Sequence, residues 1–580
     1  MSENTKTTHN QNPKPINYSD WLNQTPQWLK DAQTAVVNGQ LQTTLNLIDE
    51  NFDEQHLQNL PKIERSYTMY RVASLLRQSG DIKRAEDLLT EILKFNAHAA
   101  VYNDLSDICR KTGRTNEAIR YLKTAIDNCP NEPLLWGNLA TNLLSIGQID
   151  KAVELLHKVW QMRPENNLAA SNLLLYMHYD PKLTRSAAFE TATKWAKQNT
   201  PPSMAKTLHT TTRDPDRKLK IGYISPDFRN HSVTYFFEPL LEAHDREKFE
   251  IFGYGNIYNY DEVTDRLKTK FDHYRNVRPL NDEQIAKLIE QDGIDILVDL
   301  AGHSGNCCIY SMAYKPAPIQ VTWLGYPDTT GMSQIDYRIT DIIADPPGSE
   351  KYYSEKLFYL PEIFLCYGPC GIQLPIGPLP YLETKRITFG CFNNSTKINP
   401  LIIDLWSQIL KNVPNSQLLL KFKSGQDDEI RDMFLKRFEG FGISRDRIAI
   451  SGWLQSPHDL NLYNKVDIAL DTFPYNGTTT TCQAILMGVP VVSLVGEHHM
   501  SRVGLSILKN LGMEFFAAPT PQQYVARATA LALKPESISK IRNTMRDRMR
   551  ASTLCNKAIF AKRMEQAYRT MWQTWCNSHI

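Results

Sequence analysis

The sequence lacks the features that mark secreted, membrane and zinc-binding proteins. Its 580 residues include 10 cysteines, and no two of them form a CxxC pair. This spacing predicts neither a disulfide framework nor a zinc site. No apolar run reaches the roughly 18 residues that a membrane helix needs, and the polar N-terminus has no signal-peptide core. We therefore expect a soluble, cytoplasmic protein without a membrane span.

An excess of one charge is also missing, because 65 Lys and Arg face 63 Asp and Glu. This balance argues against a highly basic nucleic-acid binder. The motifs GxxxxGK[ST], GxGxxG and HExxH are all absent. The DxD at Asp214–Asp216 precedes the first predicted strand, so it is badly placed to hold a metal on a diphosphate. We expect catalysis without a metal or a cofactor.

The length predicts about four domains of roughly 150 residues each. Changes in composition and periodicity divide the chain into a disordered tail (1–25), helical repeats (26–200), a polar linker (201–217), two lobes (218–380 and 381–535) and terminal helices (536–580). In the last segment, the basic run Arg542–Arg550 is interpreted as a solvated helix face.

The helical segment contains a repeat of 34 residues. Six pairs of positions are 34 residues apart: Gly113 and Gly147, Ala118 and Ala152, Leu122 and Leu156, Pro130 and Pro164, Tyr102 and Trp136, and Leu105 and Leu139. Further copies are indicated by Gly80, Ala85 and Leu89, by a degenerate pair around Gly39, and by a closing helix at Asn167–Met177. The pattern resembles tetratricopeptide repeats. An ordinary helical bundle is the alternative, but bundles have no fixed period.

Short apolar runs separated by helix-length segments follow from residue 218 onward. The first series predicts strands at Leu219–Ile224, Phe249–Tyr254, Ile294–Leu300, Ile319–Trp323 and Tyr337–Thr340. After a break rich in Pro and Gly (Cys366–Pro380), the second predicts strands at Ile387–Phe392, Leu418–Phe422, Arg447–Ile450, Val466–Leu470 and Val491–Leu494. Such alternation is typical of parallel sheets, so we expect two Rossmann-like lobes with ligands at the carboxyl ends of the strands.

A run of threonines follows one predicted strand of the second lobe. Gly477 allows close backbone approach to a ligand, and Thr478, Thr479, Thr480 and Thr481 then open a helix. Hydroxyls and free N–H groups at a helix N-terminus favour an anion such as a diphosphate. The alternative is that the threonines only cap the helix, for which one threonine suffices.

Another polar turn follows the strand Ile387–Phe392 and contains Asn394 and Lys397. A lysine at a strand's carboxyl end can neutralise charge on a phosphate leaving group, as a metal would. A solvated surface lysine is the alternative interpretation.

Histidines follow strand ends in both lobes. In the first lobe, His231 is a candidate general base. His303 follows a later strand and is a candidate donor contact. Structural histidines are the alternative. In the second lobe, His498 and His499 follow the strand Val491–Leu494 and suggest a ribose or base contact, or a plain loop.

Together these residues resemble the O-linked N-acetylglucosamine transferase family, and its SPINDLY branch above all. The resemblance extends over about residues 60 to 570 and is carried by the repeats and by SPDF, HSVTYF, DLAGH, PAPIQVTWLGYP, IDYRITD, YLPEIFLCY, FGCFNN, LDTFPYNGTTTTC and GVPVV. It implies two lobes in the GT-B arrangement, metal-independent inverting transfer and protein Ser/Thr acceptors docked on the repeats.

The resemblance also implies roles for individual residues. His231 matches the cleft histidine near the acceptor, Lys397 the lysine on the donor diphosphate, and Asn394 a donor-contacting position. Donor contacts are further implied for the diphosphate helix start at Thr478–Thr480 and for the sugar loop at Leu324, Gly325 and Pro327. Where the animal enzymes have His-Thr-Thr, this chain has three threonines, and an animal arginine is replaced around Cys308.

The sequence therefore predicts a protein O-glycosyltransferase that transfers one sugar, with UDP-GlcNAc as the leading donor. GDP-fucose stays open as the donor, because the plant SPINDLY members transfer fucose. Two further alternatives are transfer to Asn and a repeat scaffold with an inactive transferase domain.

Overall fold

The computed structural model describes residues 25–578, apart from residues 38, 54–56, 165–166, 207, 210, 259, 369–373, 453 and 455–457. The predicted disordered tail lies almost entirely outside the described residues, as does Cys370 in the predicted break. The chain forms two compact units. The first comprises Met1–Thr112 and Arg120–Pro130, and the second comprises Gly113–Ile119 and Asn131–Ile580.

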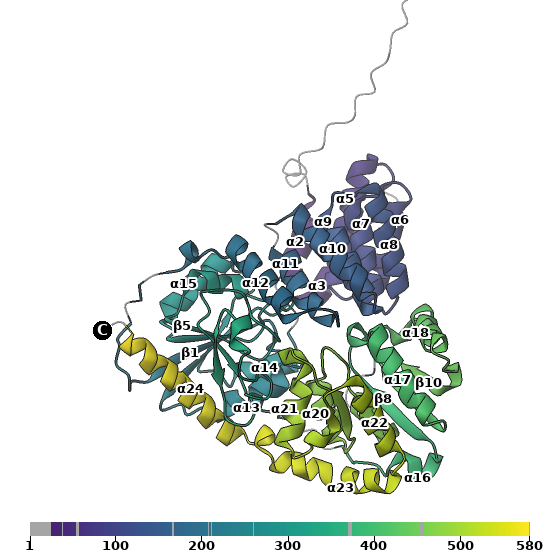
Figure 1. The fold of residues 1–580 in the computed structure, drawn as a ribbon. Helices are drawn as coiled ribbons and strands as arrows, with labels where there is room; N and C mark the ends of the chain where they lie inside the picture. The colour runs from purple at the N-terminus through teal and green to yellow at the C-terminus, as the bar shows by residue number, and fades with distance from the viewer. Residues whose placement is uncertain are drawn as a thin grey trace, which may run out of the picture. The chain divides into compact units, whose positions relative to one another are not determined.

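Paired helices make up the first unit (Figure 1). They are α2 (Gln27–Val37), α3 (Leu41–Asn51), α5 (Lys62–Gln78), α6 (Ile82–Leu93), α7 (Ala99–Lys111) and most of α8 (Thr115–Asn128). Gly39 and Gly80 turn the chain with φ of +75° and +89°, a conformation that glycine adopts without strain. The repeated Ala85 and Leu89 are buried. These helix pairs and glycine turns confirm the predicted repeats.

The last repeat helices belong to the second unit. They are α9 (Pro133–Ser145), α10 (Ile149–Met162), α11 (Asn167–Tyr176) and α12 (Arg185–Asn199). The Trp195 ring of α12 is fully buried and lies 4.4 Å from the His303 ring of the following α/β region. The division between compact units therefore falls inside the repeats, because α11 and α12 bury apolar side chains against that region.

The first parallel sheet forms an N-lobe. Its strands are β1 (Leu219–Ser225), β2 (Phe249–Gly255), β3 (His273–Asn276), β4 (Ile296–Asp299), β5 (Ile319–Thr322), β6 (Tyr337–Thr340) and β7 (Lys356–Tyr359). Their order is β3-β2-β1-β4-β5-β6-β7. All five predicted strands of this lobe are present. The connecting helices include α13 (Thr234–Ala243), α14 (Glu262–Lys268) and α15 (Asp282–Asp292).

The second parallel sheet forms a C-lobe with a corresponding order, β10-β9-β8-β11-β12-β13. Its strands are β8 (Ile387–Cys391), β9 (Ser416–Lys421), β10 (Ile448–Ser451), β11 (Ile468–Leu470), β12 (Val491–Leu494) and β13 (Ala517–Ala518). The covering helices include α17 (Pro400–Asn412), α18 (Asp428–Gly440), α20 (Thr479–Leu486), α21 (Val503–Asn510) and α22 (Pro521–Ala532). The strand order reverses between β1 and β4 and between β8 and β11, the places where such sheets bind ligands.

Two terminal helices connect the lobes, α23 (Pro535–Ala551) and α24 (Lys557–Asn577) (Figure 1). On the C-lobe, Arg542 of α23 is 1% exposed and donates to the Gly377 carbonyl at 2.9 Å. The solvated-face interpretation is therefore wrong for Arg542. On the N-lobe, the Tyr568 hydroxyl of α24 lies 3.0 Å from that of Tyr223. Among the described residues, none of the helices combines the length and apolar character of a membrane span.

Candidate functional site

The C-lobe brings the two predicted diphosphate-binding segments together where its strand order reverses. Strand β8 leads into the turn with Lys397, and the adjacent strand β11 leads into the loop before α20. The Lys397 Nζ donates to the Asn476 carbonyl at 2.8 Å. From the same two segments, Thr480 Oγ1 donates to Asn393 Oδ1 at 2.8 Å. Lys397 and the threonine run Thr478–Thr481 therefore belong to one site.

Lys397 is half-buried beside the ring of Tyr475. Its Nζ lies 4.1 Å from the centroid of the Tyr475 ring, which stacks on Tyr179 from the end of the repeats at 5.3 Å. Burial lowers the pKa of the Lys397 ammonium to about 8, and the nearby Asp471 carboxylate offsets part of that effect. A lysine held in this way keeps its charge near neutral pH and directs it at the loop.

Three of the four threonines at the start of α20 differ in what their side chains bind. Thr481 Oγ1 donates to the Gly477 carbonyl at 2.9 Å, and the Thr480 hydroxyl is committed to Asn393. Thr478 is the N-cap residue, and its side chain makes no capping hydrogen bond. Capping therefore does not account for Thr478, and its hydroxyl and the first N–H groups of the helix are placed for a ligand.

Asp471 organises this loop and received no role from sequence reasoning. Its buried carboxylate accepts from Gly477 N at 2.7 Å, Thr472 N at 2.9 Å and Ser493 Oγ at 2.7 Å. Burial raises the pKa of Asp471 to about 6, although these donors and Lys397 favour the ionised form. The sequence feature that could have identified Asp471 is its position directly after the buried strand β11.

In the N-lobe, β1 leads into the loop with His231. The His231 Nδ1 lies 3.4 Å from Asp227 Oδ1, and Thr234 Oγ1 donates to the Asp227 carbonyl at 3.0 Å. The His231 side chain is 37% exposed. Burial of part of the ring lowers the pKa of His231, while Asp227 opposes that shift. His231 is therefore neutral near pH 7. Its Nδ1 lies near the Asp227 carboxylate and also near the Val233 N–H, which donates to it at 3.4 Å.

His303 does not join this group. Its Nδ1 lies 3.1 Å from Ser171 Oγ, its Nε2 lies 3.0 Å from the Thr330 carbonyl, and the side chain is fully buried. Both ring nitrogens are thus engaged by the protein. This geometry matches the structural-histidine alternative.

The predicted sugar loop follows β5 and lies against the end of β4. Leu324 has φ of +81°, an uncommon conformation for a residue with a side chain. A Cβ on Gly325 would lie 2.0 Å from the Leu300 carbonyl oxygen, so the close approach requires glycine. Beyond the buried Pro327, Arg338 donates to the Asp328 carbonyl at 2.8 Å and holds the loop. The donor contacts of Leu324, Gly325, Pro327 and Asn394 stay predictions.

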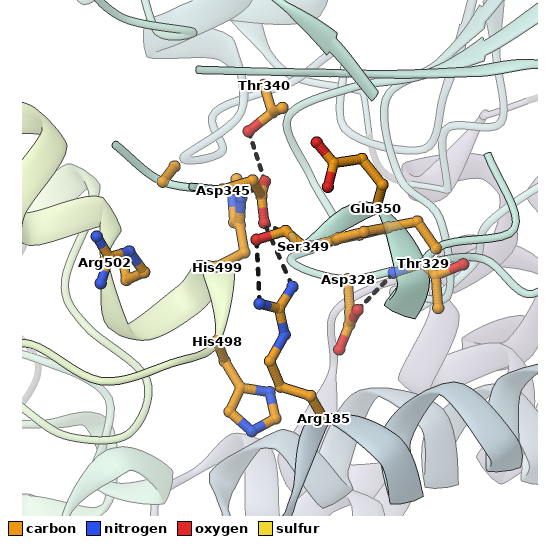
Figure 2. Close-up of polar contacts among 12 residues, drawn as sticks. Arg185, Asp328, Thr329, Thr340, Asp345, Ser349, Glu350, His498, His499 and Arg502 are labelled. Atoms are coloured by element: carbon orange, nitrogen blue, oxygen red, sulfur yellow. Dashed lines mark hydrogen bonds and ion pairs between the residues drawn. The ribbon is translucent and has the colours of Figure 1, made fainter. Parts of the chain in front are cut away.

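His498 and His499 lie where the C-lobe meets the N-lobe (Figure 2). The buried His499 Nδ1 lies 2.7 Å from Asp345 Oδ2, and Arg185 of α12 lies 3.9 Å from the same carboxylate. The His498 Nε2 lies 2.9 Å from the Leu183 carbonyl. Protein groups therefore occupy at least one nitrogen of each histidine, and the geometry favours the structural alternative for His499.

Comparison with known proteins agrees with this arrangement. Residues 200–368 and 380–564 match the profile described as Glycosyl transferase family 41, and residues 110–174 match a tetratricopeptide repeat. The structure of a Thermobaculum terrenum O-GlcNAc transferase mutant is similar with a TM-score of 0.84 at 32% identity, covering 90% of this chain and 100% of that chain.

Curated relatives include plant proteins. The Arabidopsis thaliana protein named "Probable UDP-N-acetylglucosamine--peptide N-acetylglucosaminyltransferase SPINDLY" is 40% identical over 422 residues, which cover 72% of this chain and 46% of that protein. A second A. thaliana protein of the same description, SEC, is 30% identical over 375 residues, covering 62% of this chain and 38% of its own length. The chain thus spans about half the length of the curated SPINDLY relatives it matches.

Proposed function

Because the chain belongs to glycosyl transferase family 41, we propose that it transfers a single sugar from a nucleotide-sugar to Ser or Thr of proteins. UDP-GlcNAc is the leading donor, since the curated relatives and the similar structure carry names of that activity. The observation that carries the proposal is the joint placement of Lys397 and the Gly477–Thr478 helix start where the C-lobe strand order reverses.

The C-lobe site would bind the diphosphate leaving group of the donor. Its oxygens would face the Lys397 ammonium, the Thr478 hydroxyl and the first N–H groups of α20. These groups are held by the Asn476 carbonyl, Tyr475 and Asp471 before any ligand arrives. Preorganised donors of this kind stabilise charge as it develops and can replace a metal ion. We propose that the transfer needs no metal.

The acceptor hydroxyl would attack the anomeric carbon on the face opposite the nucleotide, which inverts the configuration. His231 would receive the hydroxyl proton on Nε2 in the tautomer whose Nδ1 proton points to Asp227, which requires Nδ1 to give up its 3.4 Å contact with the Val233 N–H. The donor phosphate is the alternative proton acceptor. Protein acceptors would dock on the repeats, whose stacked helix pairs form extended binding surfaces.

A panel of nucleotide-sugars, including UDP-GlcNAc and GDP-fucose, tests the proposal with transfer to protein as the readout. Lys397→Met should lower turnover at least about 100-fold, because it removes a charge that stabilises the transition state. Lys411→Met is the matched control, since Lys411 is exposed on α17. Unchanged melting temperatures would show that both variants fold. Turnover by Lys397→Met near the wild-type rate would contradict the proposal.

The same panel separates the remaining alternatives. GDP-fucose is the second candidate donor, because Thr478 stands where the animal O-GlcNAc transferases have histidine. Mass spectrometry of the product locates the sugar on Ser and Thr or on Asn amides. Calorimetry with UDP and GDP addresses the scaffold alternative, which predicts binding of neither nucleotide.

A further inference from the structure

Three potential metal ligands meet in the second compact unit, from segments far apart in the sequence. His178 lies in the 3-10 turn Met177–Tyr179 after α11, Asp328 lies in the loop after β5, and His498 lies in the loop after β12. One ligand atom of each side chain lies within 4.8 Å of those of the other two. The His178 Nε2 and Asp328 Oδ2 atoms are 3.7 Å apart.

Neighbouring groups leave one coordinating atom of Asp328 and one of His498 uncommitted. Asp328 Oδ1 accepts from the Thr329 N–H at 2.7 Å, so Oδ2 is the oxygen that faces His178 (Figure 2 shows Asp328 and Thr329). The His498 Nε2 lies 2.9 Å from the Leu183 carbonyl. A carbonyl only accepts, so Nε2 carries the proton and the lone pair is on Nδ1.

His178 completes the group from the buried side. The side chain is fully buried, and its Nε2 also lies 3.2 Å from the Tyr326 hydroxyl, which donates to the Leu174 carbonyl. Its Nδ1 is buried and makes no hydrogen bond within the described part of the chain. His303 differs, because protein groups occupy both of its nitrogens. Because the Tyr326 hydroxyl gives its one proton to Leu174, the Nε2 of His178 carries the ring proton in the metal-free chain. A metal on Nε2 would replace the contact with Tyr326, and the ring proton would then lie on Nδ1.

We propose that His178, Asp328 and His498 form a zinc site that fastens the end of the repeats to loops of both lobes. Two imidazoles and one carboxylate are a donor set of zinc sites in which water fills the fourth position, with bonds of about 2.0–2.2 Å. Ligand atoms in a tetrahedral site are then roughly 3.4 Å apart, so closing the group needs only small side-chain movements. The Leu183 carbonyl and the Thr329 N–H act as the outer partners that orient zinc ligands.

The ligand types and the low negative charge of the proposed site favour Zn²⁺ over Mg²⁺ and Ca²⁺. Asp328 is the one carboxylate of the three ligands, and the Arg338 guanidinium donates to its backbone carbonyl. Mg²⁺ and Ca²⁺ bind through several oxygens and favour sites rich in carboxylates. Imidazole nitrogen suits Zn²⁺ instead. The proposed site differs from the sequence-based expectation of no zinc, which considered only ligands close together in the chain.

Metal content of the full chain tests the proposal independently of any transferase activity. The chain is purified without a histidine tag, stripped with a chelator, dialysed against a fixed low concentration of free Zn²⁺ and analysed by inductively coupled plasma mass spectrometry. We expect about one zinc per wild-type chain. His498→Ala and Asp328→Asn should each lower zinc occupancy at least tenfold at that concentration. His157→Gln, at an exposed histidine of α10, should bind like the wild type.

Thermal melting provides a second readout. Zn²⁺ should raise the melting temperature of the wild type and of His157→Gln, but not of the two ligand variants, and Mg²⁺ should raise none of them. Because Asp328→Asn keeps the shape of the side chain, its metal-free melting should match the wild type. Wild-type-like zinc binding by both ligand variants, or no zinc binding by the wild type, would overturn the proposal.

Discussion

Two ionisable side chains on opposite lobes limit the pH range in which the proposed reaction can run. His231 must be neutral to accept a proton, and burial places its pKa below the ordinary value of 6.5. Lys397 must be charged to hold the diphosphate, and burial places its pKa at about 8. Low pH therefore protonates His231 and removes the general base, whereas high pH deprotonates Lys397 and removes the charge on the diphosphate site. Activity should fall on both sides of neutral pH.

We expect kcat/KM to fall as the pH drops below 6.5 through the pKa of His231, and to fall again as the pH rises through about 8. This profile reports the free enzyme. Lys397→Arg should move the alkaline limb upward, because a guanidinium stays protonated. His231→Asn should remove the acid limb. Steady-state rates from pH 5 to 10 measure both limbs. An alkaline limb that stays near pH 8 in Lys397→Arg would exclude Lys397 as its source.

At the residue scale, the sequence predicted which side chains lie together at the C-lobe site but not which of them bind other protein groups. Four consecutive threonines look equivalent in sequence, yet Thr480 and Thr481 bind protein groups while Thr478 makes no capping bond. His303 follows a strand as His231 does, but α11 and α12 cover it. Long-range packing of this kind leaves no trace in the local sequence.

At the scale of the element, the start of α20 depends on close packing around Gly477. A Cβ there would lie 2.4 Å from Thr480 Oγ1, 2.9 Å from Thr481 Oγ1 and 3.0 Å from Asn393 Oδ1. These are the atoms that fix the first turn of the helix. An added methyl group would have to displace the Thr480 hydroxyl from Asn393, which would disturb the segment proposed to bind the diphosphate.

Gly477→Ala should therefore weaken donor binding, with KM for the nucleotide-sugar rising roughly tenfold, the equivalent of about 1.4 kcal/mol. Gly305→Ala is a matched control, since nothing lies within 4 Å of the position of its Cβ. Donor titrations of both variants, with melting temperatures alongside, provide the comparison. An equal rise in KM for the two variants would show that the packing at Gly477 is not the cause.

All ten predicted strands are present. Most of them bury a continuous apolar run in a parallel sheet, whereas β9 buries alternate residues and the edge strand β10 buries one. Three strands were missed for physical reasons. β3 (His273–Asn276) has a polar sequence, β7 (Lys356–Tyr359) is short and none of its residues is buried, and β13 has two residues. Edge strands carry less of the apolar pattern on which the prediction depends.

At the scale of the whole molecule, the sequence separated repeats from lobes at residue 200, whereas the compact units divide inside the repeats. The reason is that α11 and α12 are repeat-like in sequence but bury Ser171 and Trp195 against His303. The terminal helices add a second connection within that unit. α23 binds the C-lobe through Arg542, and α24 returns to the N-lobe.

Phe560 is the side chain that best tests whether α24 stabilises the N-lobe. It is 1% exposed and stacks on Trp323 at 5.8 Å, directly after β5. Phe560→Ala should cost about 3–5 kcal/mol, because it empties a packed site. For a lobe of about 150 residues, that loss corresponds to a fall of roughly 6–20 °C in the midpoint of its unfolding transition.

The neighbouring residue provides the control. Ile559 lies on the same helix but is 40% exposed, so Ile559→Ala should change stability by less than about 0.5 kcal/mol. Differential scanning calorimetry of both variants resolves the transitions of the two lobes if they separate. If α24 stabilises the N-lobe, the N-lobe of Phe560→Ala should unfold at a lower temperature than the C-lobe. The C-lobe should be unaffected, because Arg542 of α23 still binds it. A single transition at the wild-type temperature would mean that α24 covers the N-lobe without stabilising it.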